Sequence, residues 1–366
     1  MMQTNGPWPS RRIACGARGR TEEQTTMKAI QIVRPNQMEL IEMPMPELDA
    51  HNNVLVRIRA AGICGSDVGI YHGTNAAATY PRVIGHEMVG EIVKVGANVA
   101  TRKVGDRVII DQVTACGACY ACRKGRPNVC GNLKVRGVHI DGGYREYMAV
   151  PEADTYLLPD FLSDRDAIMV EPTTIAMQAC SRAELEADDD VLIIGAGALG
   201  SSMLRMVKLM HPHSIIVSDI DDVKLQEALS HGATAVIHSR TEDLAARARE
   251  LTGGYGPTVV IDAACVKGSL LSACQACGNA GRVITMGFSV AADEINQFVI
   301  TSKELDVRGS RLQNRRFGRV LELIADGKID LSGSVSHTFP FTRAQEAFDF
   351  VDSRDPSIRK IALLFD

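Results

Sequence analysis

The stretch VLIIGAGALG, residues 191–200, decides the fold of this chain. The uninterrupted apolar run VLII leads into the stretch GAGALG, which contains three glycines. The following segment, residues 201–210, has the pattern of a helix. The G-x-G-x-x-G spacing in a strand–turn–helix unit predicts a dinucleotide site, because the glycines permit a tight turn, close approach of a pyrophosphate and close helix packing. We therefore assign these residues to cofactor binding: Gly195, Gly197, Ala198, Leu199 and Gly200.

Asp219 ends the next apolar strand, SIIVSDI, residues 214–220. A carboxylate in this position accepts hydrogen bonds from the ribose hydroxyls of the cofactor and repels a 2′-phosphate. No arginine follows it, since the next residues are Ile220, Asp221 and Asp222. The sequence therefore predicts NAD rather than NADP, and a glycine-rich turn of a flavodoxin-like fold is the alternative.

The pattern around this motif predicts two domains. Apolar strands alternate with helical segments over residues 171–309, which indicates a doubly wound parallel sheet, a Rossmann domain. Residues 27–170 are instead short β-prone runs that end at Gly, Pro or Asn, and residues 310–366 return with amphipathic segments and a final strand. We expect the two latter stretches to form one β-rich domain, and the polar residues 1–26 to be a disordered tail.

Composition excludes several classes of function. The 366 residues carry 40 Lys and Arg against 44 Asp and Glu, and this net charge of −4 gives no electrostatic indication of nucleic-acid binding. No apolar run is long enough for a membrane span. The 10 cysteines are clustered in a long chain without a secretory signal, so we expect reduced thiols, a cytoplasmic protein and metal binding rather than disulfides. A small-molecule substrate is the remaining expectation.

One cysteine cluster, CGACYACRKGRPNVC, occupies residues 116–130. Four thiolates at spacings x2, x2 and x7 can surround one tetrahedral ion, and a closed set without an open position indicates a structural zinc. An iron–sulfur cluster is the alternative, because such clusters also use cysteines at x2 spacings. The four predicted ligands are Cys116, Cys119, Cys122 and Cys130.

A second candidate metal site involves AAGICGSD, residues 60–67, and the glycine-flanked His-Glu pair that begins residues 85–99. The latter stretch reads GHE-x2-G-x5-G-x2-V and resembles the signature of zinc-containing alcohol dehydrogenases of the medium-chain dehydrogenase/reductase superfamily. The four-cysteine cluster and the G-A-G-A-L-G strand follow in the family's order, and the resemblance covers residues 27–366. It implies a GroES-like catalytic domain joined to the Rossmann domain, and a dimer or tetramer.

The resemblance also implies a catalytic zinc site. Cys64 and His86 match the family's zinc ligands, and Glu87 matches a ligand of the polyol dehydrogenase branch. Glu171, in VEPTTIA, stands where ethanol-type members have a second cysteine. A cysteine, a histidine and one or two carboxylates leave a position open for water or substrate. Which of the two glutamates coordinates the metal is left open, and two zinc ions per chain are expected in all.

The family's proton relay is only partly matched. Ser66 occupies the place of the hydroxyl that takes the first step, but Gly69 replaces the histidine that usually follows. The resemblance therefore leaves three candidates to complete the relay: His72, the ribose hydroxyls of the cofactor, or a chain of water molecules.

The implied reaction is hydride transfer from a zinc-bound alcohol to NAD. The sequence looks most like a bacterial subgroup of starvation-sensing dehydrogenase-like proteins and L-galactonate and L-idonate 5-dehydrogenases, which implies a polyol or sugar-acid substrate. Arg311, in GSRLQN, aligns with an arginine that contacts substrate in sorbitol dehydrogenases. An activity like that of L-threonine 3-dehydrogenase is one alternative, and a non-catalytic nucleotide-binding sensing protein, favoured by Gly69, is another.

Overall fold

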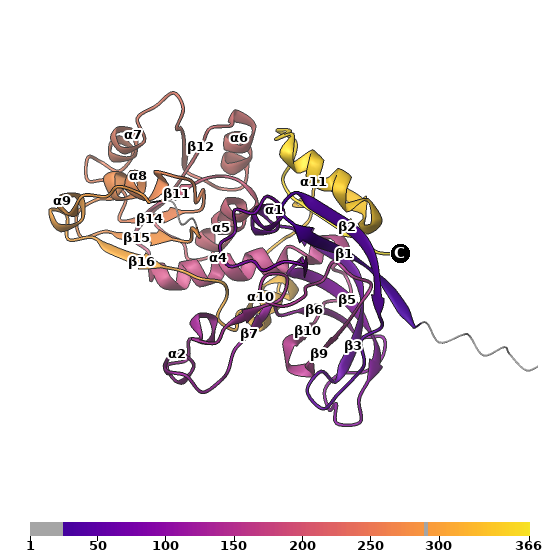
Figure 1. Ribbon diagram of the computed structural model, residues 1–366. Coiled ribbons are helices and arrows are strands. Elements are labelled where there is room, and N and C mark those ends of the chain that lie inside the picture. The colour runs from indigo at the N-terminus through magenta and orange to yellow at the C-terminus, as the bar shows by residue number, and fades with distance from the viewer. Residues whose placement is uncertain (1–24, 289–291) are drawn as a thin grey trace, which may run out of the picture.

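The computed structural model describes residues 25–288 and 292–366. The predicted tail, residues 1–26, therefore lies almost wholly outside the described residues. Figure 1 shows a parallel α/β unit on one side and a second group of strands on the other, with α4 (Val170–Ala183) running between them. Within the described part of the chain, no helix combines the length and the apolar character needed to cross a membrane.

The α/β unit is built on a six-stranded sheet in which every neighbouring pair is parallel. Residues of odd number in its central strands pack on α4, α5, α6 and α10, and those of even number pack on α7, α8 and α9. This two-faced burial is the physical reason for the uninterrupted apolar runs, and it confirms the predicted doubly wound sheet. The strands, in sheet order, are β13 (Ala235–His238), β12 (Ser214–Asp219), β11 (Asp190–Ile194), β14 (Val259–Asp262), β15 (Arg282–Thr285) and β16 (Asp306–Gly309). The helices are α5 (Ala198–Lys208), α6 (Asp222–Ser230), α7 (Leu244–Leu251), α8 (Ser269–Ala276), α9 (Gln297–Thr301) and α10 (Phe317–Ala325).

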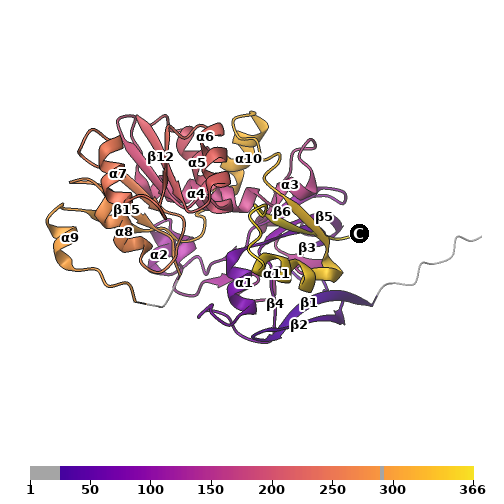
Figure 2. The same cartoon turned by 90° about the horizontal axis from the view of Figure 1, so that it is seen from above.

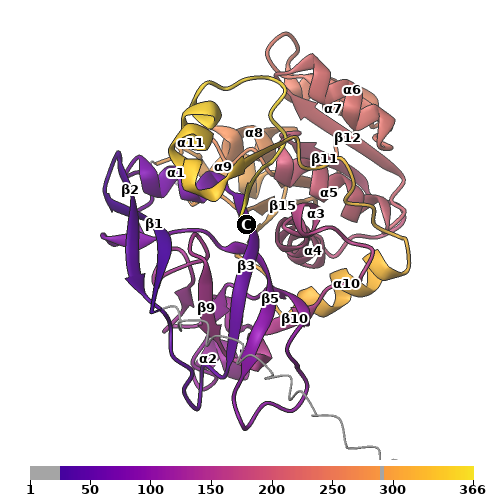
Figure 3. The same ribbon diagram turned by 90° about the vertical axis from the view of Figure 1, so that its right-hand side faces the viewer.

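The second unit is a seven-stranded sheet formed by strands from the N-terminal half of the chain together with two strands from its C-terminal part. Its last strand in sequence, β18, pairs antiparallel with β3, so that Ile361 lies opposite Ile63. Figure 3 shows the C-terminus beside β3. Residues near position 360 are therefore brought next to residues near position 62. Its strands are β10 (Thr155–Leu157), β6 (Arg107–Ile110), β5 (Glu87–Val95), β3 (Val54–Ile63), β18 (Ile361–Leu364), β17 (His337–Pro340) and β9 (Tyr147–Val150), the last of which pairs with β3.

Smaller elements surround this sheet, and a shared core joins it to the parallel one. Figure 2 shows α4 between the two units, and side chains from β3, β5 and β6 belong to the same apolar cluster as α4 and the parallel sheet. The remaining strands and α-helices are β1 (Thr26–Arg34), β2 (Gln37–Pro44), β4 (Arg82–Val83), β7 (Val113–Thr114), β8 (Lys134–Val135), α1 (Gly65–Tyr71), α2 (Tyr120–Arg123), α3 (Asp164–Ala167) and α11 (Ala344–Asp352).

Candidate active site and cofactor site

The pairing of β3 with β5 brings the predicted zinc ligands together. Gly62 lies opposite Glu87 in the antiparallel register, so Cys64 and His86 come to lie next to each other just beyond the paired ends. The sulfur of Cys64, a ring nitrogen of His86 and a carboxylate oxygen of Glu87 all lie within 4.8 Å of one another. Thiolate, imidazole and carboxylate are the donors that zinc prefers in an open, catalytic site.

The burial of these donors fits a metal ion. Glu87 is fully buried and His86 is 7% exposed. The Oε2 atom of Glu87 has no hydrogen-bond partner within residues 25–288 and 292–366. An ionised oxygen that is buried without a partner is costly, and a metal ion is a partner that would remove this cost.

Asp67, which the sequence analysis did not single out, organises this group. Its carboxylate accepts hydrogen bonds from the amides of Cys64 (2.9 Å) and Gly85 (3.3 Å), and lies 3.2 Å from Nδ1 of His86. Nε2 is therefore the ring nitrogen available to a metal. Burial would lower the pKa of His86, but the charge of Asp67 raises it well above its ordinary value, so metal and proton compete for the ring. The C-G-S-D order, with an acidic residue in the first turn of α1, is the signal that could have indicated Asp67.

Glu171 approaches the same site without joining the three-donor group. It lies in the first turn of α4, and the amide Nε2 of the fully buried Gln112 donates a hydrogen bond to its Oε1. Burial raises the pKa of Glu171 to about 8, against the opposing effect of His86. The structure thus separates the two carboxylates, with Glu87 inside the group and Glu171 beside it.

The residues considered for the proton relay lie in different places. Ser66 Oγ is 3.5 Å from His86 Nε2, at the candidate zinc site. His72 faces away from it, because its Nδ1 lies 3.0 Å from Asn36 and its Nε2 lies 3.0 Å from Asp352. A Cβ at Gly69 would lie 3.3 Å from the hydroxyl of Thr74, so a side chain at position 69 would contact Thr74. His72 is thus not placed to continue a relay from Ser66.

The four cysteines of residues 116–130 form a second compact donor group in the segment that joins β7 to β8 and includes α2. Three pairs of sulfur atoms are 3.4, 3.5 and 3.8 Å apart. Tetrahedral zinc with Zn–S bonds of about 2.3 Å places its sulfurs about 3.8 Å apart. The separations fit one tetrahedral ion and are too long for disulfide bonds of about 2.05 Å.

A different structural feature accounts for glycine at each of the three glycine positions of the dinucleotide motif. Gly195 has a φ of +96°, which favours glycine in the tight turn. A Cβ on Gly200 would lie 1.9 Å from the carbonyl oxygen of Gly195, so only glycine allows α5 to pack this close to the turn. A Cβ on Gly197 would meet no atom within 4 Å apart from its own chain neighbours and helix backbone, so the turn has open space at this point, as the predicted pyrophosphate site requires.

Asp219 ends β12 beside this turn. One carboxylate oxygen accepts a hydrogen bond from the amide of Ala196 at 2.6 Å, and the other accepts one from Ile220 at 2.7 Å. These bonds fix the carboxylate next to the glycine-rich turn, where a ribose attached to the pyrophosphate would lie.

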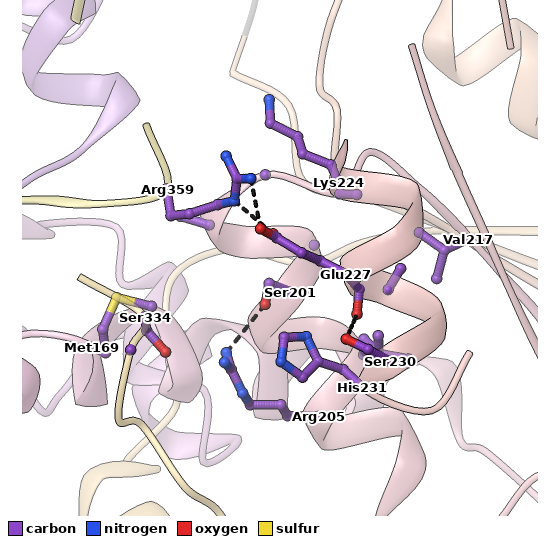
Figure 4. Close-up of a pocket in the computed structure, with 17 residues that line it drawn as sticks. Met169, Ser201, Arg205, Val217, Lys224, Glu227, Ser230, His231, Ser334 and Arg359 are labelled. Carbon is purple, nitrogen blue, oxygen red and sulfur yellow. Dashed lines mark hydrogen bonds and ion pairs between the residues drawn. The ribbon is translucent and has the colours of Figure 1, made fainter. Parts of the chain in front are cut away.

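A cavity of about 270 Å³ begins at this turn and continues between α5 and α6 (Figure 4). Its walls include Gly197 and Gly200 on one side and Lys224 on the other. Arg359 closes it from the C-terminal segment and pairs with Glu227 through two contacts of 2.6 and 2.7 Å. Lys224 and Arg359 thus place two cations near the predicted phosphate position, and no sequence motif indicated them.

Arg311 lies between the four-cysteine lobe and the end of β15. Its carbonyl accepts a hydrogen bond from Asn128 at 2.8 Å, and its guanidinium lies 5.3 Å from the ring centre of Phe288. In the described ranges the guanidinium has no acidic partner, and its Nε is buried without a hydrogen bond. The guanidinium of Arg311 thus stacks on an aromatic ring and has no charged partner among the described residues.

Comparison with known proteins agrees with this geometry. Residues 50–160 match the alcohol dehydrogenase GroES-like domain family, and residues 198–326 match the zinc-binding dehydrogenase family. The chain is 38% identical to the starvation-sensing protein RspB of Escherichia coli K12 over 340 residues, 93% of this chain and 99% of that protein. It is 31% identical to the L-galactonate-5-dehydrogenase of the same organism over 318 residues, 86% of this chain and 92% of that protein. The crystal structure of an alcohol dehydrogenase (rspB) from E. coli CFT073 with bound NADH superposes with a TM-score of 0.87 at 38% identity, covering 93% of this chain and all of that one.

Proposed function

The chain belongs to the zinc-containing alcohol dehydrogenase family, and from this premise we propose that it oxidises a secondary hydroxyl of a polyol or sugar acid with NAD as hydride acceptor. The observation that carries the proposal is the convergence of Cys64, His86 and Glu87 within 4.8 Å in a molecule that also has a complete dinucleotide turn. Asp219 beside that turn supports NAD over NADP. The likeness to an L-galactonate dehydrogenase supports the sugar-acid class.

In this proposal the chain holds two zinc ions. Cys64, His86 and Glu87 bind the catalytic one, and the four cysteines of residues 116–130 bind the structural one. When bound, zinc supplies a Lewis acid that lowers the pKa of the substrate hydroxyl, and the nicotinamide supplies the hydride acceptor. Asp67 orients the imidazole of His86. The hydroxyl of Ser66 would accept the proton that leaves the substrate while it donates its own proton to a ribose hydroxyl of the cofactor or to a chain of water molecules.

Arg311 would orient the far end of the substrate, because its planar guanidinium suits a carboxylate or adjacent hydroxyls equally. We further propose that residues 27–170 and 310–366 form the catalytic domain and residues 171–309 the cofactor domain. A cytoplasmic dimer or tetramer completes the proposal, and light scattering of the purified protein tests the assembly.

The test is NADH formation, followed by absorbance, with zinc-loaded protein and a panel of polyols, sugar acids and L-threonine. We expect turnover with NAD on one of the first two classes, and its loss in Cys64→Ser, which should still bind NADH. Turnover on L-threonine alone would replace the proposed substrate class. Absence of turnover on every compound, with both zinc and NADH bound, would favour a nucleotide-binding sensing protein.

A further inference from the structure

Lys360 is a buried lysine at the candidate zinc site. It directly precedes β18, its side chain is 4% exposed, and its ammonium donates a hydrogen bond to Oε1 of Glu87, whose side chain is 1% exposed. Lysine is almost never fully buried without a paired charge, because removing an ammonium from water is costly. The sequence motifs do not explain why a buried lysine pairs with Glu87 at this site.

The carboxylate of Glu87 is confined on two sides. Lys360 holds Oε1, and Oε2 lies over Gly62, where a Cβ would be only 1.8 Å from that oxygen. The same hypothetical Cβ would lie 3.1 Å from Cε of Lys360, so the three residues pack directly against one another. We call Gly62, Glu87 and Lys360 the carboxylate clamp. Its effect is to occupy one oxygen of Glu87 and to leave the other without a hydrogen-bond partner in the described parts of the chain.

Glu171, the competing carboxylate, is held differently. Its partner is the neutral amide of Gln112, and it lies outside the group of three donors. Lys360 thus gives Glu87 a charged hydrogen-bond donor, whereas Gln112 gives Glu171 a neutral one.

From these contacts we infer that Lys360 is a positioning residue that keeps Glu87 in the zinc ligand set, with Oε2 as the ligand atom and Glu171 outside the set. The inference rests on the catalytic zinc site of the proposed function. Lys360 does not touch the substrate or the metal in this account; it acts by restraining Glu87 to bind through one oxygen. A single bond from Glu87 leaves a coordination position for the substrate hydroxyl.

The test compares Lys360→Met with the wild-type protein and with Lys328→Met, which changes a lysine that is 56% exposed and paired only at 3.8 Å. One readout is the release of zinc to a chelator, with the four-cysteine zinc as an internal reference. The other is the visible absorption spectrum of Co²⁺ at the catalytic site, which reports the ligand set. Partners of metal ligands commonly change affinity by about 10- to 100-fold, so we expect Lys360→Met to release one zinc at least about tenfold faster and to alter the spectrum.

A second variant keeps the test informative if Lys360→Met folds poorly. Gly62→Ala retains both Lys360 and Glu87, but its methyl group would displace Oε2 of Glu87, so it should change the cobalt spectrum in the same sense.

Unchanged zinc release and an unchanged cobalt spectrum in folded Lys360→Met or Gly62→Ala would overturn the inference. These readouts do not depend on knowing the substrate. A wild-type protein that binds zinc only at the four cysteines would refute the proposed function itself, whereas two bound zinc ions with no effect of the variants would refute only the role of Lys360.

Discussion

Two single substitutions in the same turn, Gly200→Ala and Gly197→Ala, should have different effects: the first should lower stability and the second should weaken cofactor binding. In Gly200→Ala the new methyl group would lie 1.9 Å from the carbonyl oxygen of Gly195. Carbon and oxygen normally approach no closer than about 3.3 Å, so the helix and the turn must separate by about 1.4 Å. In Gly197→Ala the methyl group meets no protein atom within 4 Å, and the φ of −68° suits alanine.

The magnitudes follow from these contacts. Overpacking of this kind costs about 1–3 kcal/mol, which lowers Tm by roughly 3–10 °C for a domain of this size. Gly197 is the N-cap of α5, and replacing an N-cap residue by alanine changes stability by about 1 kcal/mol. Gly197→Ala should therefore change the free energy of unfolding by less than about 1 kcal/mol, with a correspondingly small change in Tm. Its methyl group would instead occupy the predicted position of the pyrophosphate, and we expect the Kd for NADH to rise at least tenfold, about 1.4 kcal/mol.

Thermal unfolding without cofactor measures the first effect, and the fluorescence change of NADH on titration measures the second. Both variants should retain zinc, because the turn is separate from both groups of metal donors. The reasoning is refuted if Gly197→Ala binds NADH like the wild type, or if it loses as much stability as Gly200→Ala.

Three further predictions concern other parts of the molecule. Burial raises the pKa of Asp111 from 3.8 to about 7, so the folded state binds the proton more tightly and the free energy of unfolding should fall by up to about 4 kcal/mol between pH 4 and 7. Asp111→Asn should remove this slope in denaturant titrations at each pH, whereas the exposed Asp326→Asn should leave it. Cys122→Ser should reduce the zinc content by one ion per chain and lower Tm; an unchanged zinc content would show that these cysteines hold no metal. Asp219→Gly should raise the KM for NAD by about tenfold and reduce the preference of the protein for NAD over NADP. If the ratio of kcat/KM with NAD to kcat/KM with NADP is unchanged, this carboxylate does not contact the ribose.

Features carried by contiguous residues were predictable from the sequence. The parallel sheet followed from strands that are apolar on both faces, and the turn at residues 195–200 followed from glycine spacing within one strand–turn–helix unit. The four cysteines also lie within fifteen residues, so their convergence needs no long-range contact. His72 shows the limit of this reasoning, since its nearness to Ser66 in sequence suggested a relay that its contacts with Asn36 and Asp352 do not support.

By itself, then, the sequence determined the cofactor turn, the cysteine cluster and the class of sheet, because local spacing alone sets these structures. Only the tertiary structure decided how the two carboxylates at the candidate zinc site, Glu87 and Glu171, are held. Lys360 reaches Glu87 because β18 pairs with β3, and Gln112 reaches Glu171 because the loop after β6 meets α4. Contacts between residues so distant in the chain depend on strand pairing and packing, which no local pattern of residues encodes.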